Sequence, residues 1–334
     1  MSNRWLDQVQ EDIIDPERPI IDPHHHLWND KDGSDYELDK LWADTSSGHN
    51  ILGTVFVECS TNYRKDGPEP LRPVGETEYV AEMAAESRRG NSPGQSPILA
   101  IVAHANLKLG SAVTEVFDAH REAAAGLLRG IRHSVAYYPD PPAVERYTGR
   151  IRHLLMDEDF RQGFAELAPA GLSFDAWLTH EQIPELTDIA RAFPDTTIVF
   201  DHFGGPMGIG PYAGKQAEIF EQWKLDVAEL ATCDNVVAKL GGLAMPINGW
   251  GWNERDLPAS SDEIVATHEA YYLHSIDCFG PERCMFESNF PVDKLSVSYP
   301  VLWNALKKIA ARFNEDEQTA MFRGTAERVY RLTT

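Results

Sequence analysis

Three consecutive histidines stand near the start of the chain, in the run DPHHHLW (residues 22–28). An apolar segment precedes them, so the run is predicted to lie at the end of a strand, where side chains two positions apart project to the same side. His24 and His26 should therefore face one site together, and His25 should point the other way into packing. Two imidazoles on one face can hold a metal ion or flank a substrate.

A further histidine, His202, closes the apolar segment TTIVF, and the glycines that follow let backbone approach a ligand closely. Other polar side chains end or interrupt apolar runs in the same way. A charge inside an apolar strand is costly unless it is paired or functional, so each is either a site residue or part of a buried salt bridge. These side chains are Glu58, Arg132, His133 and Lys239, with His180 just after the segment SFDAWLT.

Loops and the last apolar run supply further candidates. The run FESNFPVDK (286–294) carries Asn289 and Asp293 where a strand is expected to end. Arg64 lies in a loop, and it or Arg132 could pair bidentately with a substrate carboxylate. A Gly-rich loop with two tryptophans predicts either a pocket wall or a loop packed by its own aromatics. The aromatic candidates for substrate contact are Trp177, Trp250 and Trp252.

Eight short apolar runs recur along the chain, with amphipathic stretches between them. Several are continuously apolar rather than alternating, which is typical of strands buried on both faces of a parallel sheet. The repeated alternation of strand and helix predicts an α/β fold, a (β/α)8 TIM barrel, with a doubly wound open sheet as the alternative. The runs span residues 19–24, 51–59, 98–107, 128–136, 172–178, 196–202, 235–243 and 283–290.

The stretches between the runs set the organisation of the chain. No repeat or linker divides it, so we expect a single domain over residues 1–334, with residues 1–18 as a polar N-terminal extension. The segment 29–50 is irregular, and the loops 60–74, 204–214 and 244–261 would build the catalytic face of a barrel. Helices are expected over residues 75–89, 111–126, 151–168, 181–193, 216–231, 262–279, 299–313 and 315–330.

The charge balance narrows the class of partner. The chain of 334 residues has 30 Lys+Arg and 52 Asp+Glu, a formal net charge of −22. Such acidity disfavours nucleic acid and anionic membranes as partners and favours solubility. No run approaches the roughly 18 apolar residues of a membrane span, and the first residues lack the apolar core of a signal peptide. With four cysteines and no CxxC pair, we expect a reduced cytoplasmic protein, and leave open whether it forms a homo-oligomer.

Four motifs in order, HHHLW, DHFGGP, KLGGL and FESNFPVD, resemble the amidohydrolase superfamily. The resemblance covers nearly the whole chain from Asp22 onward. It points to the amidohydrolase-related branch of TIM-barrel hydrolases that includes sugar lactonases and 2-pyrone-4,6-dicarboxylate lactonase. It implies a small-molecule substrate and a site that either holds one divalent metal ion, with Zn²⁺ favoured, or orients substrate without metal. The residues it assigns to the metal are His24, His26, His202 and, on a looser local match, His180.

The chain departs from the pattern of this family at the last strand. That strand normally ends in a GSDWP-like motif whose Asp is the general base, and Asn289 stands at the position of the Asp. An Asn side chain cannot accept a proton from water at neutral pH and is a poor metal ligand. Either the reaction needs no base at this position, or the base has moved to Glu58, Asp293 or His133. Glu58 is preferred among them because it would end an inward-facing strand.

Hydrolysis of a lactone or related ester is the favoured hypothesis. Water would attack the carbonyl, a carboxylate would take its proton, and a metal or the histidines with Arg132 would stabilise the oxyanion. The alternatives are a decarboxylase or hydratase of an aromatic or ring-cleavage carboxylic acid, a C–N hydrolase, and a non-catalytic binding protein. No GxSxG elbow or P-loop is present to suggest a serine hydrolase or a nucleotide site. The catalytic candidates are Glu58, Arg132, His133, Lys239, Asn289 and Asp293.

Overall fold

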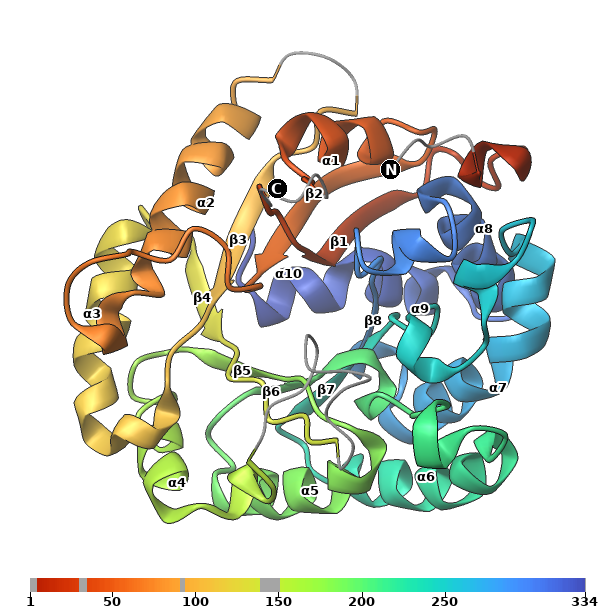
Figure 1. The fold of residues 1–334 in the computed structure, drawn as a ribbon. Coiled ribbons are helices and arrows are strands. Elements are labelled where there is room, and N and C mark those ends of the chain that lie inside the picture. The colour runs from red at the N-terminus through yellow and green to blue at the C-terminus, as the bar shows by residue number, and fades with distance from the viewer. Residues whose placement is uncertain (1–4, 30–34, 91–93, 139–150, 334) are drawn as a thin grey trace.

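The computed structural model describes residues 5–29, 35–90, 94–138 and 151–333. Eight parallel strands follow one another in chain order, each hydrogen-bonded to the next. The His26 N–H donates to the Phe290 carbonyl at 2.8 Å, which brings the end of the last strand back to the first. Figure 1 shows the ring of strands with helices around it, so the expected (β/α)8 barrel is confirmed. The strands are β1 (Pro19–His25), β2 (Asn50–Val57), β3 (Ile98–Ala103), β4 (Leu128–Ile131), β5 (Ser173–Ala176), β6 (Ile198–Phe200), β7 (Val236–Leu240) and β8 (Cys284–Phe286).

Helices cover the outside of the ring (Figure 1). The longest begins with a capping box, in which Ser260 and Glu263 each satisfy a backbone N–H of the other. In the part of the chain that the structure describes, no helix is long and apolar enough to cross a membrane. The helices are α1 (Leu38–Thr45), α2 (Val74–Ser87), α3 (Val113–Ala123), α4 (Glu158–Phe164), α5 (Ile183–Ala192), α6 (Gln216–Leu230), α7 (Ser261–Phe279), α8 (Tyr299–Ala310), α9 (Glu315–Thr319) and α10 (Thr325–Val329).

Some elements differ from those that the sequence predicts. The segment 29–50 contains the helix α1, and the closing helix expected over 315–330 is divided into α9 and α10 by a π-turn. Strands are shorter than the apolar runs, as β3 shows by ending at Ala103. Ala105 and Leu107 beyond it are fully buried, because the first residues of the loop pack back onto the barrel. The apolar pattern therefore continues past the hydrogen-bonded ladder.

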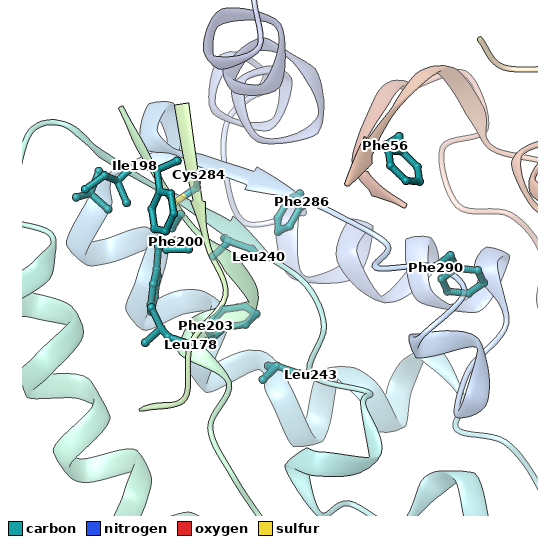
Figure 2. Close-up of a cluster of buried hydrophobic side chains, with 14 of the residues drawn as sticks. Phe56, Leu178, Ile198, Phe200, Phe203, Leu240, Leu243, Cys284, Phe286 and Phe290 are labelled. Atoms are coloured by element: carbon teal, nitrogen blue, oxygen red, sulfur yellow. The ribbon is translucent and has the colours of Figure 1, made fainter. Parts of the chain in front are cut away.

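One layer of the core lies between the strands and the surrounding helices. Ile198 and Phe200 of β6, Leu240 of β7 and Phe286 of β8 belong to it and are at most 1% exposed. Figure 2 shows these side chains projecting from neighbouring strands toward the helices. Burial of this apolar surface is the main force that holds the helices on the barrel.

A second apolar layer fills the inside of the barrel. Inward-facing residues such as Val57 and Met285 cluster there with Val329 and Tyr330, which end the chain's last helical segment. Figure 1 shows α10 lying across the centre of the ring. The Thr325 hydroxyl donates to the backbone just ahead of β8 at 2.9 Å, so this segment closes the amino-terminal end of the barrel.

Substitution of Phe164 tests the packing of the apolar layer between the strands and the helices. Phe164 is fully buried in α4, with ring centroids 5.0 Å from Phe174 and 5.1 Å from Phe193. Phe164→Ala should lower the free energy of unfolding by about 3–5 kcal/mol, because it leaves a cavity among these rings. Urea denaturation measures the loss. Phe164→Leu keeps most of the volume and should lose much less, so equal losses in the two variants would contradict this packing.

Candidate active site

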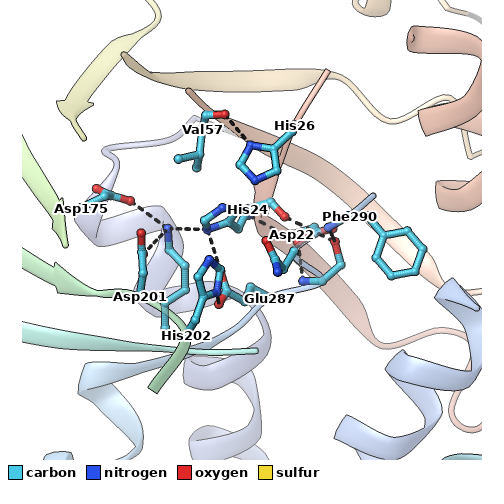
Figure 3. A network of polar contacts seen from close by, with 12 residues as sticks. Asp22, His24, His26, Val57, Asp175, Asp201, His202, Glu287 and Phe290 are labelled. Atoms are coloured by element: carbon cyan, nitrogen blue, oxygen red, sulfur yellow. Dashed lines mark hydrogen bonds and ion pairs between the residues drawn. The ribbon is translucent and has the colours of Figure 1, made fainter. Parts of the chain in front are cut away.

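Charged side chains and histidines meet inside the carboxyl end of the barrel. Each lies within two positions of a strand end, because the carboxyl ends of parallel strands open to the same side. None is more than 7% exposed. Figure 3 shows most of them joined by hydrogen bonds and ion pairs. We call this set the polar cluster; it comprises His24, His26, Glu58, Arg132, Asp175, Asp201, His202, Lys239 and Glu287.

Glu287 lies between two histidines of the polar cluster. Its Oε1 is 2.6 Å from Nδ1 of His202, and its Oε2 is 2.9 Å from Nδ1 of His24. The centroids of the two imidazole rings are 4.5 Å apart (Figure 3). One ligand atom from each of these three residues lies within 4.8 Å of the others, and no other His, Cys, Asp or Glu set among the described residues has this spacing. The three residues form the candidate metal centre.

Glycines and a left-handed turn make room for this arrangement. His202 has a φ of 54°, a conformation that β-carbon-bearing residues rarely adopt and that turns its ring toward Glu287. A Cβ on Gly242 would lie 2.5 Å from Nδ1 of His202, and a Cβ on Gly241 would lie 2.4 Å from Cγ of Glu287. The two glycines of the motif KLGGL therefore supply the space that the candidate metal centre occupies.

Two buried cations hold the other carboxylates of the polar cluster. Arg132 donates from Nε to Glu58 at 2.9 Å and from a terminal nitrogen to the Glu58 carbonyl, and its other terminal nitrogen is 3.8 Å from Asp201. Lys239 is 2.8 Å from Asp175 and 3.2 Å from Asp201. Both cations are thus engaged by carboxylates of the protein itself.

Burial keeps the histidines of the polar cluster neutral. It lowers the pKa of His202 to about 3 and the pKa of His24 well below its usual value, and the ammonium of Lys239 adds to the second effect. His26 lies 2.8 Å from the Val57 carbonyl through Nδ1. A carbonyl oxygen only accepts, so Nδ1 carries the proton and Nε2 keeps a lone pair. Neutral imidazole is the form that binds metals.

Carboxylates outnumber cations in the polar cluster, four against two. Burial raises the pKa of Glu287 well above its usual value and raises that of Asp201 to about 6, against the opposing effect of Lys239. In the described part of the chain, these carboxylates meet cations or imidazole at ion-pair distance: Lys239 lies 3.2 Å from Oδ1 of Asp201, and Nδ1 of His24 lies 2.9 Å from Oε2 of Glu287. Buried negative charge in excess of its cations is costly, and a divalent cation would offset it. The donor set therefore fits a divalent metal ion.

Asn289 and Asp293 pair with each other. The Asn289 Nδ2 donates to Oδ1 of Asp293 at 3.0 Å, and the Ala244 N–H donates to its Oδ2 at 3.3 Å. Both side chains are 1% exposed. The carboxamide that replaces the expected Asp thus anchors Asp293 and, through it, the loop after β7.

Three further residues that the sequence singles out make contacts of other kinds. The Nδ1 atoms of His180 and His133 each accept a backbone N–H, at 3.3 and 3.2 Å. Arg64 forms an ion pair with Glu78 of α2, and both side chains are exposed by more than a third. The structure does not bring these three into the candidate metal centre.

The tryptophans fall into two places. Trp177 contacts the polar cluster, with its ring edge-on to His202 at 5.2 Å. Trp250 and Trp252 pack around the buried His268, with ring centroids 5.2 and 4.7 Å from it. Their loop is thus packed by aromatic rings. This agrees with the interpretation that the loop is packed by its own aromatics, rather than with a pocket wall.

Sequence reasoning did not single out Glu287, Asp175 or Asp201. Glu287 stands where the GSDWP-like motif has Gly, so a carboxylate is present two residues before the position where one is expected. Asp175 lies inside the run SFDAWL, and Asp201 directly follows TTIVF. Both place a charge in an apolar run, which is the signal that drew attention to Lys239 and that would have found them too.

The chain is similar to known proteins over nearly its whole length. The sequence model of the amidohydrolase family (Amidohydro_2) matches residues 21–332. The uncharacterized protein y4mH of Sinorhizobium fredii is 31% identical, over 94% of this chain and 98% of its own. An L-fucono-1,5-lactonase of Burkholderia multivorans is 26% identical, over 93% of this chain and 96% of its own. A crystal structure of a Burkholderia multivorans amidohydrolase with bound Zn has a TM-score of 0.73 at 24% identity, covering 95% of this chain and 100% of that one.

A buried carboxylate behind β2 supports the position of Glu58. Glu76 of α2 is 1% exposed, and its Oε1 accepts the N–H groups of Cys59 at 3.0 Å and Thr61 at 2.8 Å. Burial, reinforced by the charge of Glu58, raises the pKa of Glu76 to about 8. Glu76 therefore fixes the loop that begins directly after Glu58.

The raised pKa of Glu76 predicts a pH dependence of stability. The folded state holds an extra proton between the ordinary value of 4.5 and the folded value of about 8, so the free energy of unfolding should fall as pH rises through that window. Glu76→Gln keeps an acceptor oxygen for both N–H groups and should flatten the fall. Urea denaturation across the window measures it, and an unchanged slope in the variant would rule out Glu76 as its source.

Proposed function

Because the chain belongs to the amidohydrolase family, we propose that this hydrolase opens the ring of a neutral sugar lactone. The observation that carries the proposal is the polar cluster, a buried anionic site at the open end of the barrel whose cations are already paired. The L-fucono-1,5-lactonases at 26% and 25% identity, aligned over 93% of this chain, support the lactone as the class of substrate.

We propose that His24, His202 and Glu287 hold one divalent metal ion, with Zn²⁺ favoured. Their spacing, their neutral imidazoles and the full burial of the Glu287 carboxylate support this, as does the bound Zn of the Burkholderia amidohydrolase. His26, whose Nε2 keeps a lone pair and whose ring centroid lies 4.9 Å from that of His24, is a further ligand candidate. When bound, such an ion supplies Lewis acidity toward an ester carbonyl.

Glu58 is the proton acceptor that we propose. It is 6% exposed, whereas Glu287 and Asp201 are fully buried, so it is the carboxylate that a water molecule at the barrel mouth can reach. Arg132 orients it through Oε1. The water oxygen bonds to the lactone carbonyl carbon as its proton passes to Glu58. The ring C–O bond then breaks, and the leaving alkoxide takes that proton, which gives the open hydroxy acid.

The charge of the site favours a neutral substrate over a carboxylate. A substrate anion would need a free cation, and both Arg132 and Lys239 are bound to carboxylates in the described part of the chain. Arg64 is paired on the surface as well. With a divalent ion bound, its two positive charges and those of Arg132 and Lys239 would only equal the four carboxylates of the polar cluster, so no net positive charge is left for a substrate anion. A polyol lactone, with hydroxyls and no charge, needs no such charge.

A substrate panel tests the proposal. Neutral sugar 1,5-lactones should be hydrolysed, with acid release followed by a pH indicator, and 2-pyrone-4,6-dicarboxylate should be hydrolysed far more slowly. Glu58→Gln should lower kcat by about 10²–10⁴-fold, since a positioned base contributes that much. Turnover of a carboxylic acid with release of carbon dioxide, and none of any lactone, would replace the proposal with a decarboxylase.

Metal removal tests the candidate metal centre. Protein dialysed against a chelator should lose activity and regain it with about one equivalent of Zn²⁺, and Glu287→Gln should weaken Zn²⁺ binding because it removes an anionic ligand. Isothermal titration calorimetry measures the number of Zn²⁺ ions bound and their affinity, and lactone hydrolysis measures the activity. Asn289→Ala is the matched control from the same strand end, and it should bind Zn²⁺ like the unmodified protein. Full activity in metal-free protein would contradict the metal centre.

A further inference from the structure

A chain of contacts connects the C-terminus to the candidate metal centre. Tyr330, fully buried at the end of the segment that closes the barrel, donates its hydroxyl to Oδ2 of Asp175 at 2.6 Å. The same oxygen is 2.8 Å from Nζ of Lys239. Nζ in turn lies 3.4 Å from Nδ1 of His24. The side chains thus contact one another in series inside the barrel: Tyr330 near the end of the chain, Asp175 of β5 and Lys239 of β7.

We propose that Tyr330 is a positioning residue of the active site, which holds Lys239 beside His24 by fixing the carboxylate of Asp175. This goes beyond the proposed function, since nothing in lactone hydrolysis requires a residue from the amino-terminal end of the barrel. Its effect on metal binding rests on the proposed metal centre.

The contacts of Asp175 explain why a hydroxyl is needed. Its Oδ2 receives both Tyr330 and Lys239, while Oδ1 has a weaker contact of 3.4 Å with Ser173. Without the phenol, the carboxylate could rotate toward Lys239 and draw the ammonium away from Asp201 and His24. The Tyr330 ring also underlies the ammonium, whose nitrogen is 5.4 Å from the ring centroid. Burial and the charge of Asp175 raise the pKa of Tyr330, so the hydroxyl keeps its proton and stays a donor.

The chain contains a matched control far from this network in sequence. Tyr36 is 3% exposed and donates to Oδ2 of Asp44 at 2.7 Å. Lys294 contacts that oxygen at 2.6 Å, and its nitrogen is 5.4 Å from the Tyr36 ring centroid. The two tyrosines therefore make the same contacts with an Asp–Lys pair, but only Lys239 adjoins a histidine of the candidate metal centre. Tyr330→Phe and Tyr36→Phe each delete one hydroxyl in the same local setting.

The first measurement needs no metal. Imidazole ¹⁵N shifts of selectively labelled, metal-free protein report the surroundings of His24, with its signals assigned by the loss that His24→Gln causes. Tyr330→Phe should move these shifts, and Tyr36→Phe should leave them in place while lowering Tm by a similar amount. Unchanged His24 shifts in Tyr330→Phe, or equal changes in both variants, would overturn the proposal.

The second measurement is Zn²⁺ affinity, by competition with a chromophoric chelator. Tyr330→Phe should bind Zn²⁺ about 10–100-fold more weakly, the range found when partners behind metal ligands are lost, and Tyr36→Phe should bind it normally. If the unmodified protein binds no Zn²⁺ while the His24 shifts still respond to Tyr330→Phe, the metal centre fails and the positioning role stands.

A third variant covers the case in which Tyr330→Phe does not fold. Tyr330 replaced by 3-fluorotyrosine keeps both the ring and the hydroxyl and makes the hydroxyl a stronger donor. The His24 shifts should then move, and the same replacement at Tyr36 should not move them. No response at position 330 would again overturn the proposal.

Discussion

The excess of buried negative charge at the carboxyl end of the barrel is the constraint on which the rest of the site depends. A fully buried carboxylate such as Glu287 is costly unless a cation accompanies it. Arg132 and Lys239 each neutralise carboxylates, but they leave an excess. The neutral imidazoles beside Glu287 and the glycines that give it room are the arrangement expected around a divalent ion.

The barrel holds these buried charges in place. Its strands place polar side chains at one end, while apolar residues such as Val57 and Met285 fill the interior beneath them. The last segment of the chain closes the opposite end, and its Tyr330 contacts Asp175 of the polar cluster. A fold that buries an ion-paired network needs every member held in place, because a partly satisfied network costs more than an apolar core. Stability and site geometry are therefore joined through the same contacts.

The sequence was a good guide to the architecture because its signals are local. Continuously apolar runs such as VVAKL and their alternation with amphipathic stretches follow from strands buried on both faces, and the barrel expected from them is confirmed. The spacing of His24 and His26 likewise reflects the period of an extended chain, and their rings lie 4.9 Å apart. Strand ends were less predictable, because loops pack apolar residues too.

Contacts across the barrel could not be predicted from the sequence, and the reason is physical. Glu287 meets His24 and His202 only when the last strand returns to the first, and no local period encodes that closure. The substitution at Asn289 signalled that a carboxylate was missing, but its counterpart two positions earlier becomes meaningful only in three dimensions. Tyr330 lies beyond a π-turn that breaks the helical pattern, so its approach to Asp175 left no trace in the sequence.

Anomalous diffraction at the zinc edge, from crystals grown with Zn²⁺, tests the central claim most directly. The account predicts one strong peak at about 2.0–2.2 Å from a carboxylate oxygen of Glu287 and from an imidazole nitrogen of both His24 and His202. A peak at Asn289 and Asp293 instead, or no peak in the polar cluster at a saturating concentration of Zn²⁺, would contradict it.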